Sequence, residues 1–179
     1  MEFEFSPEQT QLREAILALC SRFDDAYWLR KDREGGFPEE FYRAVADAGW
    51  LGIAMPEEYG GAGLGITEAA VMMQAIAESG GGLAAASSVH MNIFGLNPVV
   101  VFGSDEQKRR ALPPLIRSEQ KACFAVTEPD AGLNTTKLKT RAVRDGDRYL
   151  ISGRKVWIST AQVADNMLIL ARTTPVEEG

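Results

Sequence analysis

The sequence has few of the residues that bind metals or form disulfides: it contains two cysteines and one histidine among 179 residues. Cys20 and Cys123 form no metal-binding or redox spacing, so we interpret both as small buried hydrophobic residues in a reducing compartment. His90 has no second histidine, cysteine or carboxylate at ligand spacing. The sequence therefore indicates neither a metal site nor a disulfide framework.

The sequence also lacks targeting and membrane signals. Its first five residues, Met-Glu-Phe-Glu-Phe, have neither the basic start nor the apolar stretch of a secretory signal. No apolar run approaches the length of a membrane span, which is about 20 residues. The net charge of −6 argues against nucleic acid or an anionic membrane as a partner. We therefore expect a cytoplasmic protein with no nucleic-acid and no membrane partner.

Residues 1–118 carry the signals of helices. The composition, 45% apolar and 25% charged, is that of a globular chain able to bury a core. Ser6, Pro7 and Gln9 form a capping box that starts a first helix. We expect this helix to continue to about Lys31, because apolar residues recur at three- and four-residue spacing. Further helices are expected at 38–48, 67–78, 83–97 and 104–117, with an extended segment at 50–56 and a break at Asn97-Pro98.

The character of the chain changes after residue 118, where hydrophobicity alternates with period two and turn residues become frequent. Asp145-Gly146 is a strong hairpin signal. Strands are expected at 122–126, 137–143, 148–151, 155–158 and 166–172. The sequence therefore predicts an α+β fold: an N-terminal all-α helical domain over residues 1–118, followed by an incomplete antiparallel β-barrel or sandwich domain over residues 119–179.

Two stretches of the second part, Phe124–Leu133 and Lys155–Ser159, hold the candidate site. They combine the flat aromatic ring of Trp157 with the hydroxyls of Thr127 and Ser159 and with backbone amides beside a glycine. This set suits a planar heterocycle with polar edges, because an aromatic face stacks while hydroxyls and amides bond the rim. The same residues also suit a β-sheet core with an ordinary turn.

A resemblance to a known family favours the first interpretation. The motif Phe-Ala-Val-Thr-Glu-Pro-x-Ala-Gly begins at Phe124, Asp-Gly-Asp-x-Tyr-Leu-Ile-Ser-Gly-x-Lys-x-Trp-Ile begins at Asp145, and Ala164-Asp165 precedes an apolar strand. In order, spacing and residue type these motifs resemble the acyl-CoA dehydrogenase family, and the resemblance covers essentially all 179 residues. It implies an N-terminal helical domain, a middle β-domain and a C-terminal helical bundle, with FAD bound between the last two.

The resemblance also implies a role for each matching residue. Thr127 would bond the pyrimidine edge of the flavin, Trp157 would pack against the ring system, and Ser159 would contact it near N5. The full set of cofactor-binding positions is Phe124, Val126, Thr127, Gly132, Trp157, Ile158 and Ser159. The positions expected to contact the substrate are Ser87, His90, Phe94 and Leu133.

The sequence departs from the family pattern in two ways. Leu133 stands where the family commonly has serine, which removes a donor to the cofactor phosphate or the thioester ligand. The family's catalytic glutamate lies on the C-terminal bundle, so we assign no catalytic residue and expect the base beyond Gly179. Glu128 matches a residue that positions backbone. A β-domain that ended at Gly179 would leave an unpaired edge, so we expect either a complementary chain or a longer product.

These observations predict the N-terminal portion of an FAD-dependent acyl-CoA dehydrogenase, which desaturates an acyl-CoA thioester between Cα and Cβ and transfers a hydride to flavin N5. The family implies electron-transfer flavoprotein as the electron acceptor, and a homo-oligomer (tetramer or dimer) for the complete protein. Two alternatives stay open. The chain could be a non-catalytic half that completes its fold against a complementary chain, or part of a flavin monooxygenase or nitroalkane oxidase of the same fold.

Overall fold

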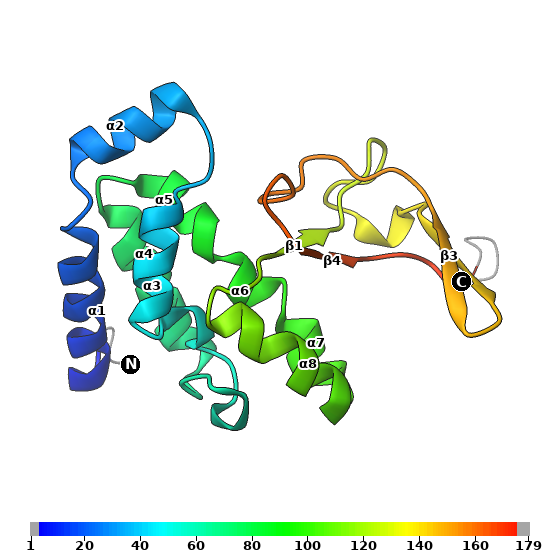
Figure 1. Cartoon of the computed structure of the whole chain (residues 1–179), viewed down its shortest axis with the longest axis horizontal. Coiled ribbons are helices and arrows are strands. Elements are labelled where there is room, and N and C mark those ends of the chain that lie inside the picture. The colour runs from blue at the N-terminus through cyan, green and yellow to red at the C-terminus, as the bar shows by residue number, and fades with distance from the viewer. Residues whose placement is uncertain (1–3, 175–179) are drawn as a thin grey trace. The chain divides into compact units, whose positions relative to one another are not determined.

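The computed structural model describes residues 4–174, and the chain divides into two compact units that join between Lys121 and Ala122 (Figure 1). The first unit is helical and the second contains the strands. The predicted boundary at residue 118 lies three residues before this division. Each unit is described by itself below.

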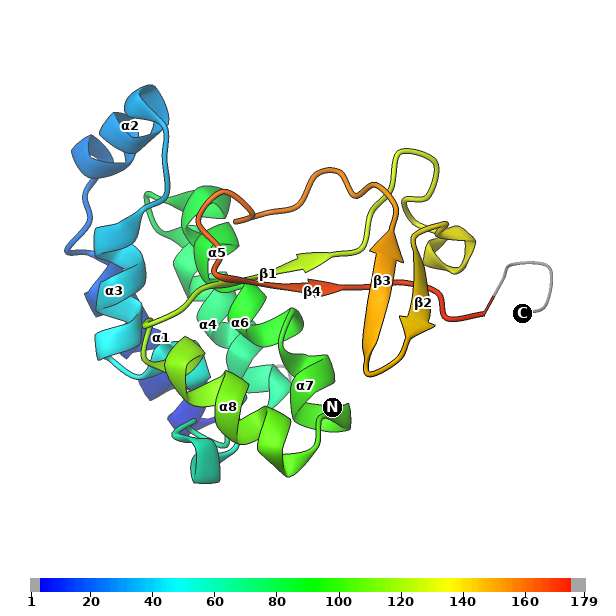
Figure 2. The same ribbon diagram turned by 45° about the vertical axis from the view of Figure 1, so that its right-hand side comes forward.

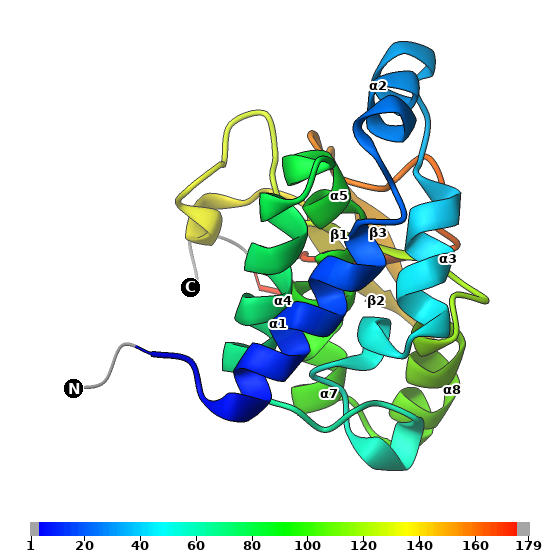
Figure 3. The same ribbon diagram turned by 90° about the vertical axis from the view of Figure 1, so that its left-hand side faces the viewer.

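The first unit consists of helices joined by short turns. They are α1 (Pro7–Cys20), α2 (Asp25–Glu34), α3 (Glu39–Asp47), α4 (Ile66–Glu78), α5 (Gly82–Val89), α6 (Met91–Phe94), α7 (Asn97–Phe102) and α8 (Asp105–Ile116), with 3₁₀ turns at Trp50–Gly52 and Glu57–Tyr59. Helices α1 and α4 pack side by side, and α4 packs against α5 (Figure 3). The side chains of Ile16, Phe41, Val45, Met72 and Ile76 are buried in the hydrophobic core of this unit.

The predicted start of the first helix is confirmed, but its predicted end is wrong. The Gln9 N–H donates to Ser6 Oγ and the Ser6 N–H donates to Gln9 Oε1, which is the expected capping box. The helix ends at Cys20, and a separate α2 begins after Asp24. The Asp24 carboxylate accepts from the Tyr27 N–H at 2.8 Å. An aspartate that caps a new helix offers the backbone an alternative to continuing the old one.

The segment 50–56 is not extended. It forms a 3₁₀ turn, Trp50–Gly52, followed by a further turn, and together they bury Leu51, Ile53 and Met55. Gly49 ends α3 with φ of 81°, as predicted, because this left-handed conformation suits glycine. The apolar residues thus reach the core from turns, which bury side chains as well as a strand would.

Residues 82–102 form three consecutive helices rather than one helix and a break. Asn97-Pro98 starts α7, since proline fits the first helical turn where no backbone donor is required. By length and composition alone the run Gly82–Phe102 is apolar enough to span a membrane, contrary to our expectation. However, 53% of its most apolar window is buried inside the structure, and buried core helices pass the same test.

Over residues 122–174 the second unit contains two separate pairs of strands (Figure 2). Strand β1 (Ala122–Ala125) pairs in parallel with β4 (Asn166–Ile169), whereas β2 (Arg141–Asp145) and β3 (Arg148–Ser152) form an antiparallel hairpin. The confirmed fold class is therefore a helical unit followed by a partial sheet unit. The expectation that all strands are antiparallel was wrong, because the long segment between β1 and β4 returns the chain to the starting edge.

The hairpin and the irregular segments differ in how well the sequence predicted them. Gly146 opens the β2–β3 turn with φ of 65°, which confirms the Asp145-Gly146 signal. The expected strand at 137–143 begins only at Arg141, because Thr135–Lys137 forms a 3₁₀ turn capped by the side chain of Asn134. The expected strand at 155–158 is absent.

Candidate functional site

The candidate site lies at the end of β1, where two segments of the second unit meet. The Val156 N–H donates to the Thr127 carbonyl at 3.0 Å. Lys155 Nζ donates to the Val126 carbonyl at 2.8 Å. The structure therefore brings the residue before Trp157 into direct contact with Thr127, although the two lie about thirty residues apart in sequence.

Glu128 is the acidic residue at the centre of this region, and its side chain is 5% exposed. Its carboxylate accepts from the backbone N–H groups of Lys139 at 2.6 Å and Thr140 at 2.8 Å, and from Lys155 Nζ at 3.0 Å. Burial by itself raises the pKa of Glu128, but hydrogen bonds from Thr140, Lys139 and Lys155 outweigh it and lower the pKa to about 2. Glu128 is therefore a charged structural group rather than a proton acceptor.

Trp157 has an unusual backbone conformation and an open side chain. Its φ is 59°, in the left-handed region that residues other than glycine rarely adopt, which explains why no strand forms here. The side chain is 90% exposed. Tryptophan normally buries most of its large apolar surface. An exposed indole, next in sequence to a residue that bonds the Thr127 carbonyl, can stack on a planar ligand.

The remaining predicted cofactor positions differ in exposure. Phe124, Val126 and Ile158 are half-buried, whereas Gly132 and Ser159 are exposed. Within the described residues no hydrogen bond joins Gly132 to the Thr127–Trp157 pair. The structure thus groups the predicted positions at the end of β1 with those around Trp157, and leaves Gly132 on the loop that follows Glu128.

The predicted substrate positions lie in different units. Ser87 and His90 are on or next to α5 in the first unit, where His90 Nδ1 is 2.7 Å from the Ser87 carbonyl oxygen. Leu133 is in the second unit and its side chain is fully exposed. The Phe94 side chain lies outside the described part of the chain. Ser87 and His90 are one helical turn apart, so they share a face.

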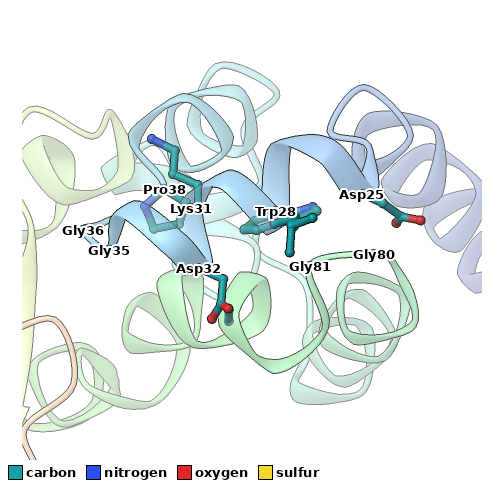
Figure 4. Close-up of a pocket in the computed structure, with 11 residues that line it drawn as sticks. Asp25, Trp28, Lys31, Asp32, Gly35, Gly36, Pro38, Gly80 and Gly81 are labelled. Atoms are coloured by element: carbon teal, nitrogen blue, oxygen red, sulfur yellow. The ribbon is translucent and has the colours of Figure 1, made fainter.

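The structure also contains a cavity that the sequence did not predict, with a volume of about 670 Å³ in the first unit. It lies between α2 and the turn before α5, and Trp28 and Gly81 lie against each other in its wall (Figure 4). Lys31 also lines it, and pairs with Glu40 at 3.0 Å. None of the predicted site residues whose side chains the structure describes lines this cavity. A smaller one, of about 340 Å³, borders Glu128 in the second unit.

Sequence reasoning also missed the ion pair between Lys155 and Glu128. Both residues are within the two stretches that drew attention, but nothing in their spacing shows that they meet. A buried acidic residue after a strand and a lysine in an apolar segment are each a weak sign of pairing, because buried charges are rarely left unpaired.

Comparison with known proteins identifies the family to which this fold belongs. Residues 6–119 match the N-terminal domain of acyl-CoA dehydrogenases, and residues 123–179 match their middle domain. The chain belongs to the acyl-CoA dehydrogenase family. The helical first unit and the strand-containing second unit correspond to these two domains.

Individual members of the family support this assignment. Acyl-CoA dehydrogenase FadE12 of Mycobacterium tuberculosis is 34% identical over 176 residues, which cover 97% of this chain and 44% of FadE12. A probable acyl-CoA dehydrogenase from Mycobacterium abscessus is 30% identical with a TM-score of 0.85, covering 95% of this chain and 45% of the other. The chain thus spans about half the length of the relatives that it matches.

The residues at the end of β1 fit the cofactor of the family. The FAD complex of PigA superposes with a TM-score of 0.88 at 26% identity, over 98% of this chain and 46% of PigA. The relatives and this FAD-bound structure support FAD as the cofactor. Trp157 and Ser159 are exposed and Thr127 is half-buried, so an aromatic face and two hydroxyl residues are accessible to a planar ligand.

Proposed function

We propose that this chain forms the N-terminal and middle-domain part of an FAD-dependent acyl-CoA dehydrogenase. The reaction is α,β-desaturation of an acyl-CoA thioester, in which the substrate loses a proton from Cα and a hydride from Cβ. Bound FAD supplies the hydride acceptor at N5 of its ring system. The observation that carries the proposal is the Val156–Thr127 hydrogen bond, which joins the two motifs of the family and leaves Trp157 exposed beside them.

In this proposal the residues of the chain bind and orient rather than transfer protons. The Thr127 hydroxyl bonds the pyrimidine edge of the ring, Trp157 packs against the ring system, and the Ser159 hydroxyl contacts the edge near N5. Phe124, Val126, Gly132 and Ile158 complete the cofactor site. We assign no catalytic base to the chain: Glu128 is excluded because three N–H donors occupy its carboxylate and its pKa is about 2.

The proposed substrate contacts are assigned for each unit by itself. Ser87 and His90 form part of the wall of the acyl-chain cavity, and Leu133 approaches the thioester end. Because a leucine donates no hydrogen bond there, we expect a weaker hold on the ligand than a serine would give. We further propose a cytoplasmic location, a role in fatty acid metabolism, electron-transfer flavoprotein as the acceptor, and a homo-oligomer for the complete protein.

The proposal is tested by loading the purified full-length protein with FAD and measuring the flavin retained after gel filtration. The wild type should retain flavin, and Thr127→Ala and Trp157→Ala should each weaken FAD binding by about tenfold or more, since each removes a direct contact. Tyr149→Ala is the matched control. Tyr149 is a half-exposed aromatic on the hairpin of the same unit, and its loss should leave the FAD Kd unchanged.

A second measurement separates the enzymatic alternatives. Under anaerobic conditions, butyryl-, isovaleryl- and octanoyl-CoA, and then a nitroalkane, are added in turn to the flavin-loaded protein. Loss of the oxidised flavin absorbance with any of them supports the dehydrogenase, and loss only with a nitroalkane would favour the alternative enzyme of the same fold. A protein that stays colourless after loading would contradict the proposal and leave the non-catalytic assembly half.

A further inference from the structure

Lys155 connects the two segments that form the proposed flavin site. Its ammonium donates to the Val126 carbonyl at 2.8 Å and to Glu128 Oε1 at 3.0 Å. The side chains of Lys155 and Glu128 are 10% and 5% exposed, so both charges have been removed from water. A buried ion pair is tolerated when further hydrogen bonds satisfy both groups. This requirement fixes the position of Lys155 against the end of β1.

The acceptor side of this contact is held rigidly. Besides Lys155, the Glu128 carboxylate accepts from the backbone N–H groups of Lys139 and Thr140. Glu128 also forms a backbone bridge with Ala131, which closes the turn that follows Thr127. The ammonium of Lys155 therefore binds to an anchored turn and not to a flexible loop.

The segment that follows Lys155 requires such support. Trp157 has φ of 59°, and a non-glycine residue in the left-handed region is less stable than in its ordinary conformations. Such a conformation persists only where surrounding contacts over-determine it. The backbone of Val156 supplies one contact, the hydrogen bond to the Thr127 carbonyl. Two further contacts come from the ammonium of Lys155, two residues before Trp157.

We propose that Lys155 is a positioning residue of the flavin site. Through Glu128 and the Val126 carbonyl, it holds Trp157 and Thr127 in the relative position in which they bind the ring system of FAD. Lys155 itself does not contact the reacting atoms. This inference rests on the proposed function, because it assigns a supporting residue to the same site.

The experiment compares variants of the full-length protein by FAD titration and by the visible spectrum of the bound flavin. Lys155→Met should weaken FAD binding by about tenfold or more, because small displacements of binding groups have large effects. It should also shift the flavin absorbance at saturating FAD, since the contacts of the ring change. Lys155→Arg, which keeps the charge and the donors, should restore part of both properties.

Lys139→Met is the matched control. Lys139 belongs to the same unit and also forms an ion pair, with Asp130 at 3.1 Å, but its side chain is 71% exposed. Its contact with Glu128 is made by the backbone N–H, which the substitution preserves. The FAD Kd and the flavin spectrum of Lys139→Met should match those of the wild type.

The double variant Glu128→Gln/Lys155→Met protects the test against a folding defect, because it removes both buried charges together. It should fold and still bind FAD weakly with a shifted spectrum. A folded Lys155→Met protein with the wild-type Kd and spectrum would overturn the proposal. So would unfolding of both variants, which would make Lys155 a folding residue. A wild-type protein that fails to bind FAD would instead contradict the proposed function itself.

Discussion

The two units of the chain differ in how they are stabilised. The hydrophobic core cluster lies entirely in the first unit, and nearly all of the largest fully buried side chains belong to it. In the second unit every residue of β3 is exposed, and apolar side chains such as Val143, Leu150 and Ile151 are about half-exposed. The helices thus complete a core among themselves, whereas the β2–β3 hairpin leaves apolar side chains exposed.

The two units also differ in net charge. Residues 1–121 contain eleven basic and eighteen acidic residues, a net charge of −7, whereas residues 122–179 contain eight basic and seven acidic residues, a net charge of +1. The acidic surface of the first unit repels polyanions. The second unit lacks this repulsion, as suits a region proposed to bind a cofactor that carries phosphates.

The largest expected effect is the loss of an aromatic ring from the core of the first unit. Phe41 is completely buried and packs edge-to-face with Phe23 and Trp28. Phe41→Ala should lower the free energy of unfolding by about 3–5 kcal/mol. Val143→Ala is the counterpart in the second unit, where the side chain is 45% exposed, and should cost less than about 1 kcal/mol. Urea denaturation measures both, and similar costs would refute the comparison.

The second test removes the charge of Glu128, which is buried in the second unit as Phe41 is buried in the first. Glu128→Gln should destabilise this unit by about 3 kcal/mol or more, since it leaves Lys155 buried without its anion. The pKa of Glu128 is lowered from 4.5 to about 2. Its contribution is therefore complete above pH 4.5 and is lost as the pH falls toward 2.

Hydrogen exchange of the amides of β2 and β3 as a function of pH measures this contribution. In the wild type protection should decrease below pH 4.5, whereas Glu128→Gln should lack this decrease. Equal pH profiles for the two proteins would show that the carboxylate contributes nothing as an anion.

Gly153 lies in a closely packed part of the second unit. A Cβ on Gly153 would lie 2.2 Å from Thr140 Oγ1 and 2.7 Å from Thr140 Cα. Gly153→Ala should therefore cost about 1–3 kcal/mol. Gly132→Ala, where a Cβ would meet nothing within 4 Å, should change stability by less than about 0.5 kcal/mol. Thermal unfolding of the two variants should separate them by several degrees, and overlapping curves would contradict the predicted crowding.

The smallest expected effects come from capping residues. Ser6→Ala should cost about 1 kcal/mol, because it leaves the Gln9 N–H without its acceptor at the start of a fourteen-residue helix. Asn134→Ala in the second unit should cost less, because the 3₁₀ turn that it caps has three residues. The helical signal in circular dichroism during urea titration measures the first. A larger effect for Asn134 would mean that the second unit depends on its turns more than its packing indicates.

The sequence predicted those features that depend on a few neighbouring residues. The capping box at Ser6, the left-handed glycine after α3 and the hairpin at Gly146 are all confirmed, because each is set by local hydrogen bonds or backbone freedom. The break before α2 was missed because the apolar stripe continues to Phe23, and the competing cap at Asp24 is a single residue.

Features that depend on distant parts of the chain were predicted less well. Nothing in β1 or β4 alone shows that they pair in parallel, since strand direction is fixed by the path of the chain between them. The segment Lys-Val-Trp-Ile has the composition of a strand, but the positive φ of Trp157 ends that possibility. The link between Lys155 and Glu128 spans twenty-seven residues. The roles of the individual cofactor and substrate residues stay predictions.

The parallel pairing of β1 and β4 has a consequence for the order of folding. Ala122 pairs with Asn166, so the strands meet only after the intervening segment has been made and has closed a long loop. The contacts that build the first unit, such as the packing of α1 against α4, join elements that all precede β1 in the chain. During synthesis, domains fold as units from the N-terminus. The helical unit can therefore fold before β4 has been synthesised, and β1 pairs only after β4 has left the ribosome.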